Sequence, residues 1–226
     1  MFRGLDALMG DDSPHSHDAY QAGEESDEYG VPRFSEAPAS PPPAPPIPSF
    51  DFIAALRDSS TLSKEDTQRI LAAAVGAGAN DFRKAIEQIT EEARSNPELQ
   101  VRAGIGQFFL GEPEDAIEWL GNSSEGIGRY YLAQAYLSVE RYDDAAKEFE
   151  QAGKLGYNPT ECTLRRAGAV RRAGSLEDAE ELIRSTGSDG ARLAEYSYQM
   201  GCILSDRGDT FGAIEYFERA SDMDPH

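Results

Sequence analysis

Long hydrophobic runs and basic residues are both scarce in this sequence of 226 residues. No apolar run approaches about 18 residues, so no membrane-spanning helix is expected. Lysine and arginine together number 21 against 41 aspartates and glutamates, which gives a formal net charge of -20. A protein that binds nucleic acid directly needs a basic surface for the phosphates, and an anionic membrane would repel this charge. The composition therefore argues against both as partners.

Cysteine is also rare, with Cys162 and Cys202 as its two occurrences. Two cysteines can form one disulfide bond, but free thiols in a reducing compartment are the favoured interpretation. The first ten residues lack a basic segment followed by an apolar core, which a secretory signal requires. Together these features predict a cytoplasmic protein.

Residue types that carry catalysis or bind metals are missing from most of the chain. His226 is the single histidine beyond the first quarter, so acid–base chemistry at neutral pH would depend on carboxylates. Residues 104–106 lack the third glycine and the preceding strand of a phosphate-binding loop, and no Gly-x-Ser-x-Gly motif occurs. His15 and His17 lie near Asp18, but a metal site needs more ligands at fixed geometry. We therefore predict no catalytic residue, no metal site and no cofactor.

The beginning of the chain differs in composition from the rest. Residues 1–50 hold nine of the 13 prolines, and nine acidic residues against two arginines. Low hydrophobicity with net negative charge cannot offset the conformational entropy that is lost on ordering. We therefore predict that residues 1–49 form a disordered acidic, proline-rich tail. The proline run at 41–48 is interpreted as an extended spacer, with a ligand for an aromatic-lined groove as the alternative.

Helical patterns begin at residue 50. They predict a short amphipathic helix over residues 50–57, a second helix over 64–75 and a third over 80–95. No stretch alternates with period two for long, so we expect no sheet. Residues 50–98 are thus predicted to be N-terminal helices and a candidate degenerate repeat.

Four short stretches further along are alike, and each ends in an alanine that opens an amphipathic run. These alanines are Ala116, Ala145, Ala179 and Ala213. The last two steps between them are 34 residues and the first is 29, so the first unit is predicted to have lost part of its second helix or its loop. A period in this range is typical of an array of helical hairpins. We place the units at residues 99–125, 126–159, 160–193 and 194–226.

Small and large residues recur at regular spacing within these units, and the small ones are expected where two helices cross closely. The second unit resembles the tetratricopeptide repeat family in the pattern Leu132-Ala133-Tyr136-Tyr142-Ala145-Phe149-Ala152. The fourth resembles it in the pattern Met200-Gly201-Leu204-Gly208-Ala213-Phe217-Ala220-Pro225. The resemblance implies an all-α fold, namely a right-handed α-solenoid of stacked helical hairpins preceded by the disordered tail.

A second resemblance concerns bacterial proteins that carry such repeats ahead of a domain like the C-terminal domain of the RNA polymerase α subunit. Residues 103–110 and 196–201 are similar to the repeat region of those proteins, and the domain itself is absent from this sequence. Arrays of hairpins need a polar capping helix after the last unit, and none follows Pro225. The sequence is therefore expected to be a fragment or to have its end covered by a partner, and self-association through that end is one route.

Four arginines cluster within residues 163–174, and two of them, Arg165 and Arg172, are seven apart and project from one helix face. In the tetratricopeptide repeat family this face lines the concave groove in which peptides dock. The resemblance thus implies a groove for a partner, whose candidate residues are Tyr130, Tyr131, Gln134, Leu137, Leu164, Arg165, Gly168, Arg172, Tyr198 and Gln199. Guanidinium groups flanked by tyrosines suit an acidic peptide. The alternative is that the arginines pair with the protein's own acidic residues near in sequence, such as Glu161, Glu177, Asp178 and Glu180.

These features predict a non-catalytic protein–protein interaction module that holds a peptide or protein partner, for which acidic chemistry is one candidate. The alternative is the repeat region of a transcription-associated protein whose nucleic-acid-binding or polymerase-binding domain lies outside this sequence. Neither interpretation gives these residues a nucleic acid, a membrane or a cofactor as a direct partner.

Overall fold

The computed structural model describes residues 50–58, 64–74 and 78–224. The chain divides into two units, Met1–Ile47 and Pro48–His226, and all of the described residues belong to the second. The predicted disorder of residues 1–49 and the predicted end of the second helix at residue 75 therefore lie outside the described residues.

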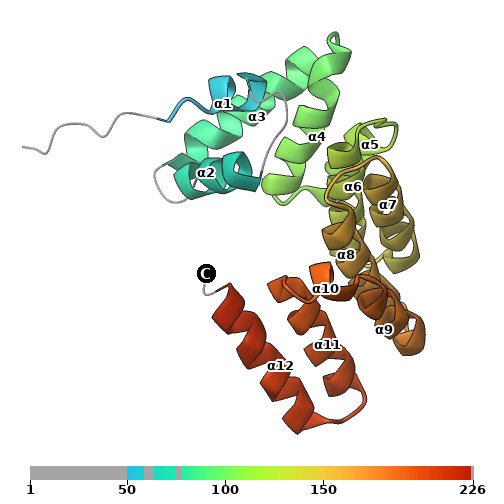
Figure 1. Ribbon diagram of the computed structural model, residues 1–226. Helices are drawn as coiled ribbons and strands as arrows, with labels where there is room; N and C mark the ends of the chain where they lie inside the picture. The colour runs from blue at the N-terminus through green and yellow to red at the C-terminus, as the bar shows by residue number, and fades with distance from the viewer. Residues whose placement is uncertain (1–49, 59–63, 75–77, 225–226) are drawn as a thin grey trace, which may run out of the picture. The chain divides into compact units, whose positions relative to one another are not determined.

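Helices account for all regular secondary structure in the described ranges, as the sequence predicts (Figure 1). The N-terminal part holds α1 (Phe52–Asp58), α2 (Lys64–Ala74), α3 (Ala79–Ala93) and a short 3-10 helix, η2 (Pro97–Leu99). The helices that follow are α4 (Gln100–Phe109), α5 (Pro113–Leu120), α6 (Gly126–Ser138), α7 (Tyr142–Lys154), α8 (Pro159–Arg172), α9 (Leu176–Ser185), α10 (Gly187–Gly190), α11 (Ala194–Asp206) and α12 (Thr210–Met223). Within the described ranges, none of these helices has the length and apolar character needed to cross a membrane.

The three N-terminal helices agree with the predicted ones to within two residues. Phe52 of α1 contacts Phe82 of α3 edge to face, with ring centroids 5.3 Å apart. The first helix starts later than predicted because Asp51 lies just before it and its side chain accepts a hydrogen bond from a free N–H group of the first turn. The Ala54 N–H donates to Asp51 Oδ1 at 2.9 Å, as in an N-cap.

Most of the remaining helices pair into four hairpins, which are α4/α5, α6/α7, α8/α9 and α11/α12. Each helix of these hairpins packs against the next one in the chain, and first helices of neighbouring hairpins also meet, α4 with α6 and α8 with α11. In Figure 1 the hairpins follow one another from the green α4 to the red α12. This arrangement is an α-solenoid of stacked helical hairpins, as predicted.

The second helix of the first hairpin is shorter than the second helix of the following hairpin. α5 has eight residues and α7 has 13. After Ala116, α5 continues to Leu120, whereas after Ala145, α7 continues to Lys154. The five residues by which α5 falls short match the difference between the steps of 29 and 34. Of the two explanations that the sequence allowed, the shortened helix is therefore the correct one.

Small side chains lie where the helices of a hairpin cross, as predicted. Ala133, Ala145 and Ala152 of the second hairpin are fully buried. In the last hairpin, a Cβ atom on Gly201 would lie 2.7 Å from the ring of Phe217, which is closer than packed atoms approach. The close approach of the two helices therefore depends on these small residues.

The turn between the two helices of a hairpin needs a left-handed backbone. Gly111, Gly174 and Gly208 have φ angles of 80°, 100° and 83°, and glycine adopts them without a Cβ clash. Glu140 occupies the equivalent place in the α6/α7 hairpin with a φ of 58°. A residue with a Cβ atom costs about 1–2 kcal/mol in this conformation.

Replacing Glu140 with glycine is therefore expected to raise the free energy of unfolding by about 1 kcal/mol, because relief of strain exceeds the entropy that glycine adds to the unfolded chain. Urea denaturation followed by circular dichroism measures the change. Gly174→Ala is the reciprocal control and should lower the free energy of unfolding by a similar amount. Equal stability of the Glu140→Gly variant and the parent would contradict the assignment of strain to this turn.

Candidate functional site

The first helices of three consecutive hairpins bring six polar side chains together. Each of α6, α8 and α11 contributes two residues that are four positions apart and lie on the same face of the helix. These pairs are Tyr130 and Gln134, Glu161 and Arg165, and Glu195 and Gln199. We call the six residues the first-helix cluster.

The hydroxyl of Tyr130 links α6 to α8. It accepts a hydrogen bond from the Gln134 side-chain amide at 3.3 Å and donates one to Glu161 Oε1 at 3.1 Å. The Tyr130 side chain is buried, and this burial raises the pKa of its hydroxyl well above the ordinary value for tyrosine. The hydroxyl therefore keeps its proton and remains a hydrogen-bond donor across the physiological pH range.

An ion pair links α8 to α11. Arg165 Nη2 lies 3.2 Å from Glu195 Oε2, and the Gln199 side-chain amide donates to Glu195 Oε1 at 2.8 Å. Burial alone would lower the pKa of Arg165, but the charge of Glu195, with smaller contributions from Tyr130 and Glu161, raises it above its ordinary value. The guanidinium therefore stays charged between two carboxylates. The cluster therefore holds two carboxylates and one guanidinium group.

Two further arginines of α8 also pair with acidic residues of this chain. Arg166 lies 3.6 Å from Glu150 of α7, and Arg171 lies 2.6 Å from Asp206 of α11. Together with Arg165, three of the four clustered arginines are thus neutralised from within the protein. Their partners come from adjacent helices rather than from residues near in sequence, because the stacking of hairpins brings those helices within reach.

Five of the residues predicted to contact a partner are buried by the protein itself, namely Tyr130, Tyr131, Leu164, Gly168 and Gln199. Leu164 has no exposed surface, and Tyr131 is buried with its hydroxyl 3.4 Å from Thr67 Oγ1 of α2. A Cβ atom on Gly168 would lie 2.7 Å from the amide nitrogen of Gln199, so the Gln199 side chain covers this glycine. These five residues therefore offer little surface to a partner, which corrects their sequence-based assignment.

Other predicted residues keep surface outside the network. Tyr198 of α11 is 46% exposed, and its ring centroid lies 6.0 Å from that of Phe217. Leu137 is partly buried. Arg172 is exposed and forms no ion pair within residues 50–58, 64–74 and 78–224. Arg172 and Tyr198 are thus the predicted residues with the most surface for a partner.

The two carboxylates of the cluster were not assigned to the site from the sequence. Glu161 was considered as a charge partner only, and Glu195 was missed. A signal was present, because the two glutamates are 34 residues apart and each precedes a predicted site residue by four positions. Reading the repeat for polar as well as small residues would have found both.

Family comparisons agree with the hairpin geometry. Residues 130–190 match one family model described as tetratricopeptide repeat, and residues 194–226 match a second model with the same description. Residues 130–190 and 194–226 therefore consist of tetratricopeptide repeats. The matched residues begin at Tyr130 within α6, extend through α12 and include the whole first-helix cluster. The second resemblance, to proteins with a domain like the RNA polymerase α C-terminal domain, stays a prediction.

Solved structures of the same fold include the following three. MamA is 19% identical over 73% of this chain and 96% of that chain, with a TM-score of 0.55. MamA from Desulfovibrio magneticus RS-1, from its residue 41 onward, is 16% identical over 78% and 97%, with a TM-score of 0.56. YrrB, described as a TPR protein with an unusual peptide-binding site, is 15% identical over 78% and 94%, with a TM-score of 0.52. At these identities the likeness shows the fold alone. A search of curated proteins found no match.

Proposed function

We propose that this protein with tetratricopeptide repeats is a non-catalytic scaffold that binds a peptide or protein partner along the first helices α6, α8 and α11. The observation that carries the proposal is the exposed surface of Arg172 on α8 and of Tyr198 on α11, two helices that the first-helix cluster joins to each other and to α6. Arrays of this kind present such side chains on an extended surface, which suits an extended or helical segment. The free thiols of Cys162 and Cys202 favour a cytoplasmic location for this scaffold.

The chemistry of the partner follows from the charged and aromatic side chains near the cluster that are exposed and unpaired in the described ranges. Arg165 is paired with Glu195, so it has little attraction left for an acidic ligand. Arg172 lies two helical turns further along α8 with its charge unpaired in the described ranges, and Tyr198 offers exposed aromatic area on α11. We therefore propose a partner segment with an acidic residue at the Arg172 end and polar groups along the cluster. The peptide-binding site named for YrrB supports this kind of partner for the fold.

Selection of short random peptides displayed on phage, with the full chain as bait, tests the proposal. Peptides that bind are expected to carry acidic residues, and their Kd is expected to rise at least about tenfold in Arg172→Glu, because a hydrogen-bonded charge contact becomes a repulsion. Tyr198→Asp should weaken them as well, since an aromatic contact is lost.

Arg83→Glu is the matched control, because Arg83 is an exposed arginine of α3 whose reversal makes the same change in net charge away from the cluster. This variant should retain the parent affinity. Peptides that bind the parent, Arg172→Glu and Tyr198→Asp equally well would refute a binding surface on these helices.

A further inference from the structure

The most exposed large hydrophobic side chain in the described part of the chain is Phe211, the second residue of α12, at 86%. Burying an aromatic side chain against a partner is strongly favourable, because it removes a large apolar area from water. Phe211 lies away from the first-helix cluster in sequence and belongs to a second helix, so the proposed peptide surface does not account for it.

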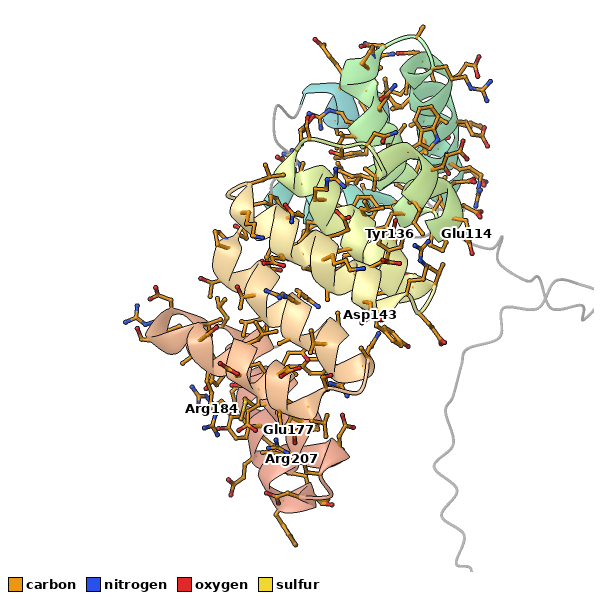
Figure 2. The ribbon with its side chains drawn as sticks, turned by 90° about the vertical axis from the view of Figure 1, so that its right-hand side faces the viewer. Glu114, Tyr136, Asp143, Glu177, Arg184 and Arg207 are labelled. Atoms are coloured by element: carbon orange, nitrogen blue, oxygen red, sulfur yellow. The ribbon has the colours of Figure 1, made fainter. Side chains whose placement is uncertain are left out.

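The same position carries an acidic residue in each preceding hairpin. Glu114, Asp143 and Glu177 are the second residues of α5, α7 and α9, and all three are exposed. An acidic residue in the first turn is favourable because it faces the positive end of the helix dipole. Figure 2 labels these three residues, one on each of the preceding second helices. Phe211 replaces this favourable acid with an exposed ring.

A following hairpin would not by itself cover Phe211. The side chain of Glu177 is 85% exposed although the α11/α12 hairpin follows it directly. The place that Phe211 occupies is thus open to solvent even where the array continues. The exposure of Phe211 is therefore a property of this position on the second helices. An aromatic ring at such a position can be buried by contact with another molecule.

The rest of this face of α12 combines one more apolar residue with acids. Ile214 follows Phe211 by one turn and is 47% exposed. Glu215, Glu218 and Asp222 extend the same face at helical spacing, and all three are exposed. In the described ranges no ion pair involves these three acids, whereas Glu177 of α9 is paired with Arg207 at 3.7 Å. The face thus begins with two apolar side chains and continues as a stripe of unpaired negative charge.

We propose that this face of α12 binds an amphipathic helix of a partner protein that has apolar residues at one end and lysines or arginines along the same side. The aromatic ring of Phe211 would anchor the partner, since buried aromatic residues dominate interface energies. The stripe of Glu215, Glu218 and Asp222 would select for positive charge and speed association. A second copy of this chain is disfavoured, because it would place the same acids opposite one another on molecules that each carry a net charge of -20.

A synthetic amphipathic peptide of leucine and lysine, with leucines spaced three and four residues apart, is the probe for this surface. Fluorescence anisotropy of the labelled peptide against the full chain gives its Kd. Phe211→Asp introduces the residue type that Asp143 has at the equivalent place, so we expect the fold to tolerate it. We expect this variant to weaken binding at least about tenfold. Because the substitution also adds negative charge, non-specific attraction of the basic peptide would change the affinity in the opposite direction.

Two further variants separate this surface from the proposed peptide surface. Reversing charge in Glu215→Lys with Glu218→Lys should also weaken the peptide at least several-fold and reduce the dependence of its Kd on salt. Arg172→Glu on α8 should leave the affinity unchanged, whatever it does to ligands of the first-helix cluster.

A peptide of the same composition with scrambled leucine positions should bind the parent and Phe211→Asp equally and weakly. The proposal is overturned if the parent does not bind the amphipathic peptide, or if Phe211→Asp binds it as tightly as the parent. It is also overturned if the parent dimerises in light scattering and Phe211→Asp abolishes the dimer, since the occupant would then be a second copy.

Discussion

Replacing Phe149 with alanine is expected to lower the free energy of unfolding by about 3–5 kcal/mol. Phe149 lies in α7, has no exposed surface and is among the largest fully buried side chains of the described ranges. Its ring packs edge to face on that of Tyr130, with centroids 5.5 Å apart. Alanine would leave a cavity between α6, α7 and α8 that the neighbouring helices can fill only in part.

Urea denaturation, followed by both circular dichroism and tyrosine fluorescence, measures this loss. Two probes are needed because stacked hairpins can unfold in more than one step. Phe149→Leu is the matched control and should lose less than about 1.5 kcal/mol, since most of the volume is kept. A loss below about 1 kcal/mol in Phe149→Ala would show that the ring does not hold α6 and α7 together.

The same substitution connects the core to the candidate site. Phe149 supports the ring of Tyr130, whose hydroxyl joins Gln134 and Glu161. Even where Phe149→Ala stays folded, we therefore expect weaker binding of peptides selected on the first-helix cluster. Binding of the Leu/Lys probe to α12 should change little, because that helix lies in another hairpin.

Cys162 is expected to react about a thousandfold more slowly than a free, solvent-exposed thiol. Cys162 is buried, and its thiol donates to the Tyr157 carbonyl at 3.0 Å. Burial, and to a smaller extent the charge of Glu161, raises the pKa of Cys162 to about 12. Only the thiolate attacks, and each unit of pKa lowers its fraction about tenfold at mildly alkaline pH. Cys202 is only partly buried, so a reagent can reach it and it should react before Cys162.

Reaction of the native chain with an aromatic disulfide reagent measures the difference. One thiol per chain should react quickly, and the second only at a higher pH or after unfolding. Cys202→Ser should remove the fast phase and Cys162→Ser should leave it intact. Two thiols that react at the same rate in the parent would contradict the burial of Cys162. Since Cys202 lies on α11 one turn after Tyr198, a bulky label on it should also weaken ligands of the first-helix cluster.

Much of the fold was predictable because its signal is periodic. The alanines at 34-residue steps and the glycines before three of the four second helices located the hairpins, and Gly111, Gly174 and Gly208 adopt the expected left-handed turn. Helix ends were predicted to within two residues in the N-terminal part. The short α5 was predictable as a deletion, but the sequence could not say whether helix or loop was lost, because both change the step equally.

The candidate site was predicted less well, for a physical reason that Arg165 and Leu164 illustrate. Helical spacing says which direction a side chain takes from its own helix, but burial depends on what the adjacent helices place there. Leu164 is buried by neighbouring helices, and Arg165 forms its ion pair with Glu195 on α11 rather than with an acidic residue nearby in sequence.

The sequence by itself determined an all-helical repeat protein with a strongly acidic charge, because helix formation, hairpin spacing and net charge depend on residue type and local order. Only the tertiary structure decided that three of four clustered arginines are neutralised, that α6, α8 and α11 share one polar network, and that Phe211 stands in solvent. These features depend on which side chains of different helices meet, and that is settled when the hairpins stack.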